Sequence, residues 1–371
     1  MKGIVDSTLR EGEQAAHVYL DLNEKLRIIE LLIDVGIDEI ELGIAQKNPE
    51  IKKLMKKAKK LDGCPKLGLW CRCLPHDIDE TLALFPDILN LSIPVSDIHL
   101  KNRLGRDRDW IMRRVGESIR QAGNKTSCYL SLGLEDASRA DTEFLEKVCL
   151  IAQEEGIDRV RFADTLGIMD PLTMANTITR LKSLLKIDIG VHTHNDFGMA
   201  TANAVSALSA GADFADVTVN GLGERAGNAA LEEIIAFLVK KRGMGKYRLK
   251  PLYSLSRYVA EVSHIPIYQK KPVVGEDIFT CESGIHIDGL IKDTSTYEPY
   301  DPSEVCLERK FLVGKKAGKN SLYHKLKTLG IKTESHILEA LLIKVKNESS
   351  RIKMNLSDEN LLHLYYSLVN G

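Results

Sequence analysis

The chain has 371 residues, with 51 basic and 52 acidic side chains and a formal net charge of -1 at pH 7. This balance gives no electrostatic reason to expect nucleic acid or an anionic membrane as the main partner. No apolar run reaches the roughly 18 residues of a membrane span, and no secretory leader precedes the first strand pattern, so we expect a cytoplasmic protein. The seven cysteines are scattered and odd in number, which is typical of reduced thiols.

Short β-rich runs alternate with amphipathic helical stretches up to about residue 242. The predicted strands cover residues 3–8, 37–43, 65–72, 88–95, 127–135, 159–164, 187–194 and 214–221. Eight strands that are each followed by a helix predict a parallel (β/α)8 TIM barrel over residues 1–242. A doubly wound sheet is the alternative, but it would place a GxGxxG turn after an early strand, where this chain has DSTLREGEQ. The basic run KKLMKKAKK (52–60) is typical of the solvated face of the second helix.

The pattern changes after residue 242. KRGMGKYRLKP is typical of a linker, and it is followed by a helical stretch (252–262), an irregular segment (264–320) and a last helical part. We therefore predict that residues 243–371 form a linker and a small, mostly helical C-terminal accessory region near the barrel mouth.

Polar side chains recur where the predicted strands end, and in a barrel these ends share one mouth. The set comprises Asp6, Ser7, Thr8, Arg10 and Glu11, then Arg72, Glu135, Asp136, Asp164, Thr165, His192, His194, Asn195 and Asp196, and finally the NGLGERAGN run after the eighth strand. Their recurrence at the same end of successive strands predicts that the mouth holds the active site.

The segment VHTHND (191–196) places two histidines two positions apart at the end of a predicted buried strand. Because side chains alternate in a strand, His192 and His194 point to the same face, as two ligands of one metal would. A carboxylate of the first loop, Glu11 or less favourably Asp6, would complete the set and leave positions open for water and substrate. These ligands suit Zn, Mn, Fe, Co or Mg, and the sequence does not choose among them.

DSTLREGEQ (6–14), RFADTLG (161–167), HTHNDFGMA (192–200), NGLGERAGN (220–228) and ESGIHIDG (282–289) together resemble the DRE-TIM metallolyase superfamily. The resemblance is to its acyl-CoA-condensing branch, which includes homocitrate, isopropylmalate, citramalate and Re-type citrate synthases. It implies an acyltransferase that condenses acetyl-CoA with a metal-bound 2-oxo acid and then hydrolyses the thioester. A carbon–carbon lyase of the same superfamily is an alternative, but it would want a cysteine in the loop that here reads NGLGERAGN. A non-catalytic barrel would have no need for Arg10, Glu11, His192 and His194 together.

The resemblance also assigns roles to residues. Glu11, His192, His194 and Asn228 match the metal ligands, which makes Asp6 an outer-shell residue. Arg10 matches an arginine that stabilises developing negative charge, with an ion pair to Glu13 as the structural alternative. His286 and Tyr297 match residues of the proton-transfer step, with Glu135 as a partner; a turn-capping histidine and a linker-anchoring tyrosine are the alternatives. In the family these C-terminal residues reach a neighbouring subunit, which implies a homodimer.

The choice of 2-oxo acid is the open question. A dicarboxylic substrate needs donors for its distal carboxylate, and the candidates are Arg72, Ser131, Arg161 and Thr165. The WCR, EDASRAD and NGLGERAGNAALEE stretches resemble the homocitrate synthase of the nitrogenase-cofactor type, with Re-citrate synthase next and isopropylmalate or citramalate synthase after it. The segment after the barrel leaves little room for an amino-acid feedback domain, and we expect none.

Overall fold

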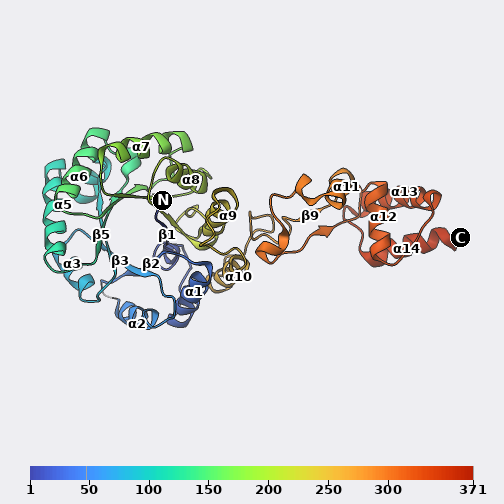
Figure 1. Ribbon diagram of the computed structural model, residues 1–371, viewed down its shortest axis with the longest axis horizontal. Helices are drawn as coiled ribbons and strands as arrows, with labels where there is room; N and C mark the ends of the chain where they lie inside the picture. Colours follow the sequence, from blue (N-terminus) through green and yellow to red (C-terminus); the bar gives the residue numbers. More distant parts are fainter. Residues whose placement is uncertain (47, 371) are drawn as a thin grey trace. The chain divides into compact units, whose positions relative to one another are not determined.

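Eight short parallel strands close into a barrel in the computed structural model, which describes residues 1–46 and 48–370 (Figure 1). The strands follow one another in chain order, and the first pairs with the last, with Gly3 opposite Phe214 and Asp6 opposite Val217. They are β1 (Gly3–Asp6), β2 (Glu39–Ile44), β3 (Lys66–Arg72), β4 (Ile88–Pro94), β5 (Tyr129–Glu135), β6 (Arg159–Asp164), β7 (Asp188–Thr193) and β8 (Phe214–Val217). The predicted (β/α)8 barrel is confirmed.

Helices surround the barrel, and the sequence marks where they begin. Asp21 caps the first of them, accepting from the backbone of Asn23 and Glu24, while Asp170 caps another just before Pro171. The helices are α1 (Leu22–Val35), α2 (Pro49–Ala58), α3 (Pro75–Leu82), α4 (Asp97–His99), α5 (Arg108–Gly123), α6 (Thr142–Glu154), α7 (Pro171–Leu184), α8 (Ala200–Ser209), α9 (Leu231–Arg242) and α10 (Pro251–Ser263). The exposed lysines of α2 confirm the predicted solvated face. None of the helices in the described ranges combines the length and apolar character needed to cross a bilayer.

Strand β8 ends earlier than the sequence predicts. The predicted strand ran to residue 221, whereas pairing with β1 stops at Val217 and a short 3-10 turn, η4 (Val219–Gly221), follows. Asn220 has a left-handed φ of 61°, and Gly221 has one of 71°. A strand cannot continue through this conformation, so the chain turns over the barrel mouth at this point.

The interior of the barrel is charged. Side-chain alternation places Glu39 and Glu41 of β2, Arg159 and Arg161 of β6, and Asp216 of β8 among its buried polar residues. TIM-barrel interiors are usually filled by branched apolar side chains. In this barrel, ion pairs between strands occupy positions that apolar side chains usually fill. The first of these pairs lies at the N-terminal end of the barrel. There, Arg159 Nη1 lies 3.0 Å from Glu39 Oε2, and its guanidinium lies 4.4 Å from the ring centroid of Phe214.

The chain divides into two units, Met1–Ile267 and Tyr268–Gly371. Residues 243–267, predicted to belong to the accessory region, lie in the first unit. There α10 packs against α1, and the Tyr247 hydroxyl donates to Asp38 over 2.6 Å. The predicted irregular segment 264–320 contains a helix, α11. The second unit comprises β9 (Thr280–Cys281), α11 (Gly284–Lys292), η5 (Thr294–Thr296), η6 (Pro302–Val305), β10 (Lys310–Phe311), α12 (Lys319–Thr328), α13 (Ser335–Ile352) and α14 (Asp358–Val369). Its core includes Leu322, Leu326, Leu341 and Val345, so the mostly helical character is as predicted.

Replacing Arg159 by methionine should destabilise the barrel by about 3 kcal/mol, because the carboxylate of Glu39 would stay buried without its partner. The double variant Arg159→Met with Glu39→Leu should recover most of this loss, since no charge is then left in the interior. Urea unfolding followed by circular dichroism measures both. A single variant within about 1 kcal/mol of the wild type would contradict the pairing.

Candidate metal centre and reaction cavity

Three buried side chains bring ligand atoms together at the barrel mouth. Glu11 belongs to the loop after β1, His192 to β7, and His194 follows β7 directly. The Nε2 atoms of the histidines lie 3.2 Å apart, and each lies 3.5 Å from Glu11 Oε1. This group of Glu11, His192 and His194 has its ligand atoms within 4.8 Å of one another, the arrangement that one metal ion requires.

The chemistry of the donors fits a metal. The carboxylate of Asp216 lies 3.0 Å from Nδ1 of His192, so Nδ1 carries the hydrogen and Nε2 presents its lone pair to the site. Burial lowers the pKa of His192, and burial with the neighbouring His192 lowers the pKa of His194 to about 3. Both imidazoles are therefore neutral at pH 7, which is the form that binds a divalent cation.

Asn228 and Asp6 both lie near these three ligands, but their hydrogen bonds differ. Asn228 forms a backbone bridge with His194, its Nδ2 donates to the carbonyl of Leu222 over 3.0 Å, and its buried Oδ1 has no partner among the described residues. Asp6 accepts hydrogen bonds from the backbone and the hydroxyl of Thr8, and it is not one of the three converging ligands. Thr8 Oγ1 in turn accepts from the backbone of Val219, so Asp6 helps to join the loops after β1 and β8.

Arg10 is held by carboxylates beside the ligand group. Its Nε donates to Glu41 Oε2 over 2.5 Å, and its Nη1 donates to Glu11. The alternative partner, Glu13, pairs instead with Lys25 over 2.7 Å, which rules out the ion pair considered for Arg10. Burial alone would raise the pKa of Glu41, but Arg10 and Arg161 hold it below its ordinary range. The Arg10 guanidinium is thus fixed next to a candidate metal ligand.

A cavity of about 210 Å³ contains this group. Its lining residues are Arg10, Glu11, Gln14, Trp70, Ser92, Arg103, Gly133, Glu135, Arg161, Ala163, Thr165, His192, His194, Glu224 and Arg225. Of the predicted substrate-binding residues, Arg161 and Thr165 line it. Ser131 does not, because it lies deeper and its hydroxyl accepts from Arg159 over 3.2 Å. Arg72 does not either, because its Nε donates to Asp77 of α3 over 2.6 Å.

Glu135, predicted to take part in proton transfer, lines the cavity and pairs with Arg103. His286 and Tyr297 lie in the second unit, where their ring centroids are 4.3 Å apart. The structure therefore brings this predicted pair together. Tyr297 is half-exposed and His286 is exposed, so neither ring is locked into a core.

Three functional candidates were missed from the sequence: Glu41, Arg103 and Asp216. Glu41 and Asp216 carried a signal, because an acidic residue on the inward face of a buried strand requires a partner. Arg103 carried less of one, since it stands in a single π-helical turn, η2 (Leu100–Leu104), that no spacing rule predicts.

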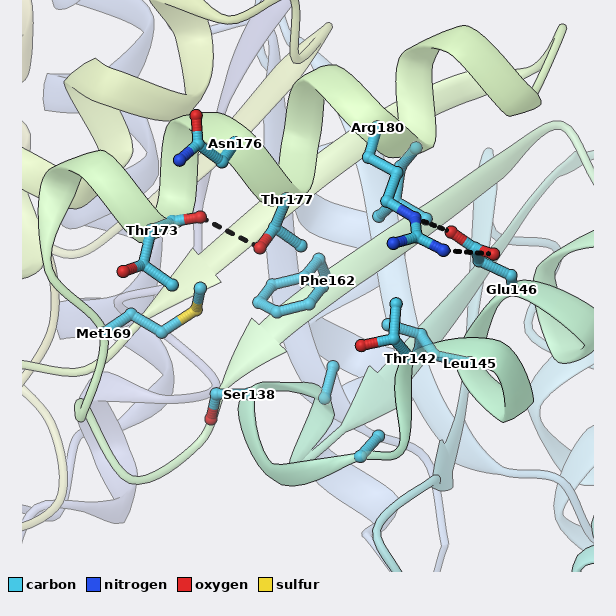
Figure 2. A pocket seen from close by; sticks show the side chains of 13 residues that line it. Ser138, Thr142, Leu145, Glu146, Phe162, Met169, Thr173, Asn176, Thr177 and Arg180 are labelled. Carbon is cyan, nitrogen blue, oxygen red and sulfur yellow. Dashed lines mark hydrogen bonds and ion pairs between the residues drawn. The ribbon is translucent and has the colours of Figure 1, made fainter.

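A larger cavity of about 340 Å³ lies outside the barrel between α6 and α7 (Figure 2). Phe162, Leu145 and Met169 supply apolar lining, and Figure 2 shows Arg180 pointing toward Glu146, with Nη2 donating over 3.1 Å. These two charges satisfy each other, and none of the predicted site residues is among those that line this cavity. The smaller cavity at the barrel mouth is therefore the candidate site.

Fold and site together define a TIM-barrel enzyme with a candidate metal centre at its mouth. The sequence profile of the HMGL-like family matches residues 2–259, and that of the "Homocitrate synthase post-HMGL domain-like" family matches residues 273–353. The chain therefore belongs to the HMGL-like family, as its resemblance to the DRE-TIM metallolyases predicted.

Relatives match along nearly the whole chain. "2-isopropylmalate synthase 2" of Caldanaerobacter subterraneus subsp. tengcongensis is 41% identical over 99% of this chain and 95% of its own length. "Homocitrate synthase 1" of Nostoc sp. is 39% identical over 97% of this chain and 96% of its own. The solved HMG-CoA lyase of Bacillus subtilis has a TM-score of 0.65 and 19% identity over 72% of this chain and 95% of its own, which shows the fold alone. The predicted condensing branch is confirmed.

Replacing Glu11, His192 or His194 by alanine should weaken binding of Mn2+ or Zn2+ by more than about 100-fold, since even outer-shell partners of ligands are worth about 10- to 100-fold. Titration of metal-free protein against a chromogenic chelator measures this. Glu13→Ala is the matched control, because Glu13 lies two positions from Glu11 and pairs with Lys25. Equal losses in Glu13→Ala and Glu11→Ala would contradict the ligand assignment.

Asp6 should make stability depend on pH. Burial raises its pKa to about 7, so the folded protein keeps a proton that the unfolded chain releases near pH 3.9. The folded state binds more protons between these values, and the free energy of unfolding therefore falls as pH rises from about 4 to 7. Asp6→Asn stays neutral, so its free energy of unfolding should not fall in this window. Its stability relative to the wild type should therefore increase with pH, by up to roughly 4 kcal/mol. Urea unfolding at pH 4.5 and 8 checks this; a pH-independent difference would show that Asp6 is charged throughout.

Proposed function

We propose that the protein condenses acetyl-CoA with a 2-oxo dicarboxylic acid and hydrolyses the resulting thioester. The observation that carries this proposal is the convergence of Glu11, His192 and His194 beside Arg10 in one cavity, on a chain that matches condensing synthases along its length. In the reaction, the methyl group of acetyl-CoA loses a proton and forms a carbon–carbon bond to the keto carbon. Water then cleaves the thioester, and a 2-hydroxy polycarboxylate and CoA leave.

Glu11, His192 and His194 would hold the divalent metal, with the orphaned Oδ1 of Asn228 as a further oxygen donor. When bound, such an ion supplies a Lewis acid and a template for the 2-oxo acid. Arg10 adds a fixed positive charge for the oxygen that becomes negative as the carbon–carbon bond forms. Because Glu41 and Glu11 hold the guanidinium in place, no reorganisation is required during the reaction.

Proton transfer is assigned to the three side chains that the family resemblance points to. His286 is the acid–base residue of this proposal, Tyr297 orients it through their ring contact, and Glu135 is the carboxylate of the cavity that assists. We further propose a cytoplasmic homodimer, in which His286 and Tyr297 of one subunit serve the barrel of the other. Cys71, Cys73 and Cys149 are buried thiols that form no disulfide among the described residues, which is consistent with a reducing compartment.

Arg103 supports a dicarboxylic substrate. A second cavity of about 230 Å³ shares Trp70, Ser92, Arg103 and Glu135 with the metal cavity. The rest of its lining is mostly apolar, including Leu74, Ile93, Pro94, Leu104 and Trp110, and Arg72 also lines it. A 2-oxo acid held at the metal can extend its chain along these walls and place a distal carboxylate on Arg103. Thr165 is the hydroxyl donor of the metal cavity for the first carboxylate.

2-Oxoglutarate is the substrate we favour, which makes the protein a homocitrate synthase. Oxaloacetate, and so a Re-type citrate synthase, is second, and isopropylmalate or citramalate synthesis follows. The test is CoA release from acetyl-CoA with a divalent metal and each of 2-oxoglutarate, oxaloacetate, pyruvate and 2-oxoisovalerate. A preference for 2-oxoglutarate is expected. A preference for pyruvate or 2-oxoisovalerate would overturn the dicarboxylic substrate, and no release with any of the four would overturn the condensation.

Arg103→Ala should lower the ratio of kcat/KM for 2-oxoglutarate to that for pyruvate by about 10-fold or more, since a hydrogen bond to a charged group is worth roughly 1.5–3 kcal/mol. Steady-state CoA release measures the ratio. Lys101→Ala is the matched control, because Lys101 is an exposed cation of the same π-helical turn. An unchanged ratio in Arg103→Ala would remove Arg103 from substrate selection.

A further inference from the structure

Arg161 lies between the two halves of the candidate metal centre. On one side, its Nη1 donates to Asp216 Oδ2 over 2.8 Å, and this same oxygen lies 3.0 Å from Nδ1 of His192. On the other side, Nη1 lies 3.2 Å from Glu41 Oε1, while Glu41 Oε2 holds Arg10. One guanidinium thus connects the carboxylate behind a metal ligand with the carboxylate behind the arginine of the reaction.

This connection lies within the barrel and has little freedom. The Arg161 side chain is 4% exposed, that of Asp216 is 2% exposed and that of Glu41 is fully buried. Each of the three comes from a different strand, β6, β8 and β2. Glu41 has further donors in Ser7, over 2.7 Å, and Asn90, over 2.9 Å. A carboxylate that is buried and shared in this way keeps its orientation only while its cation is present.

We propose that Arg161 is a positioning residue of the metal centre, which holds Asp216 against His192 and Glu41 against Arg10. The inference rests on the proposed metal site, and it replaces the substrate-binding role that the sequence suggested for Arg161. A substrate-binding role would use the part of Arg161 that lines the cavity, but two buried carboxylates already neutralise its charge. Without Arg161, Asp216 would turn away from Nδ1, and His192 would lose the hydrogen bond that directs its lone pair.

The chain supplies a matched control in Arg159. It lies two positions earlier on β6, has a side chain that is 1% exposed, and pairs across the barrel with Glu39. This ion pair is buried in the same barrel interior. Within the described part of the chain, Glu39 contacts neither His192 nor His194. Loss of either arginine disturbs the interior of the barrel, whereas only Arg161 connects to a metal ligand.

The experiment measures Mn2+ and Zn2+ affinity of metal-free protein without substrates, together with the visible absorption spectrum of the Co2+ form. Arg161→Gln and Asp216→Asn should each weaken binding by about 10- to 100-fold and change the Co2+ spectrum. The double variant should lose little more than either single variant, because both changes break one connection. Arg159→Gln should bind metal as the wild type does, whatever its stability. Arg161→Lys keeps the charge without the planar fork, so it should lose less affinity than Arg161→Gln, and it provides the test if Arg161→Gln does not fold.

Wild-type metal affinity and an unchanged Co2+ spectrum in Arg161→Gln, with a raised KM for the 2-oxo acid, would overturn the proposal and return Arg161 to substrate binding. Equal losses in Arg159→Gln would overturn it as well, by showing a general effect of barrel stability. A wild-type protein that binds the metal but releases no CoA would overturn the synthase function and leave the role of Arg161 intact. A wild-type protein that binds no divalent metal would overturn both.

Discussion

Charge pairing inside the barrel is the constraint on which the rest of the structure depends. An isolated charge in such an interior is strongly unfavourable, so each one requires a partner. The partners come from different strands: Glu39 with Arg159, and Glu41 and Asp216 with Arg161. These pairs can form only when the barrel is closed in the observed register. Closure of the fold and assembly of the site are therefore the same event, since Asp216 and Glu41 also hold His192 and Arg10.

The hydrophobic pattern was sufficient to predict the barrel, because each strand needs only its neighbours in the chain. The alternation within VHTHND was likewise sufficient to place His192 and His194 on one face. Pairings across the barrel could not be predicted in this way. Glu41 and Arg161 are 120 positions apart in the sequence, and their contact depends on the stagger of all the strands between them. Sequence spacing contains no information on that stagger.

Local competition accounts for the other differences. Alternation alone would aim Arg72 at the mouth, but Asp77, in the first turn of the next helix, takes its guanidinium. Sequence spacing made Glu13 a plausible partner for Arg10, but Glu13 forms an ion pair with Lys25 of α1 instead. In both cases a charged residue on the following helix forms an ion pair that sequence spacing did not predict. The predicted end of the eighth strand was wrong because Asn220 and Gly221 adopt a left-handed backbone conformation.

The shared carboxylate oxygen of Asp216 has a consequence for how such a barrel changes over evolutionary time. A single replacement among the interior charges leaves a partner stranded, whereas a simultaneous change of both partners preserves neutrality. Charged residues of the interior are therefore expected to be replaced in interacting pairs, and Glu39 and Arg159 can change together. Glu41, Arg161 and Asp216 lack this freedom, because they form a set of three that also holds the reactive groups. The pair at the N-terminal end of the barrel can therefore change in sequence, while the three residues nearer the mouth are constrained by the site that they support.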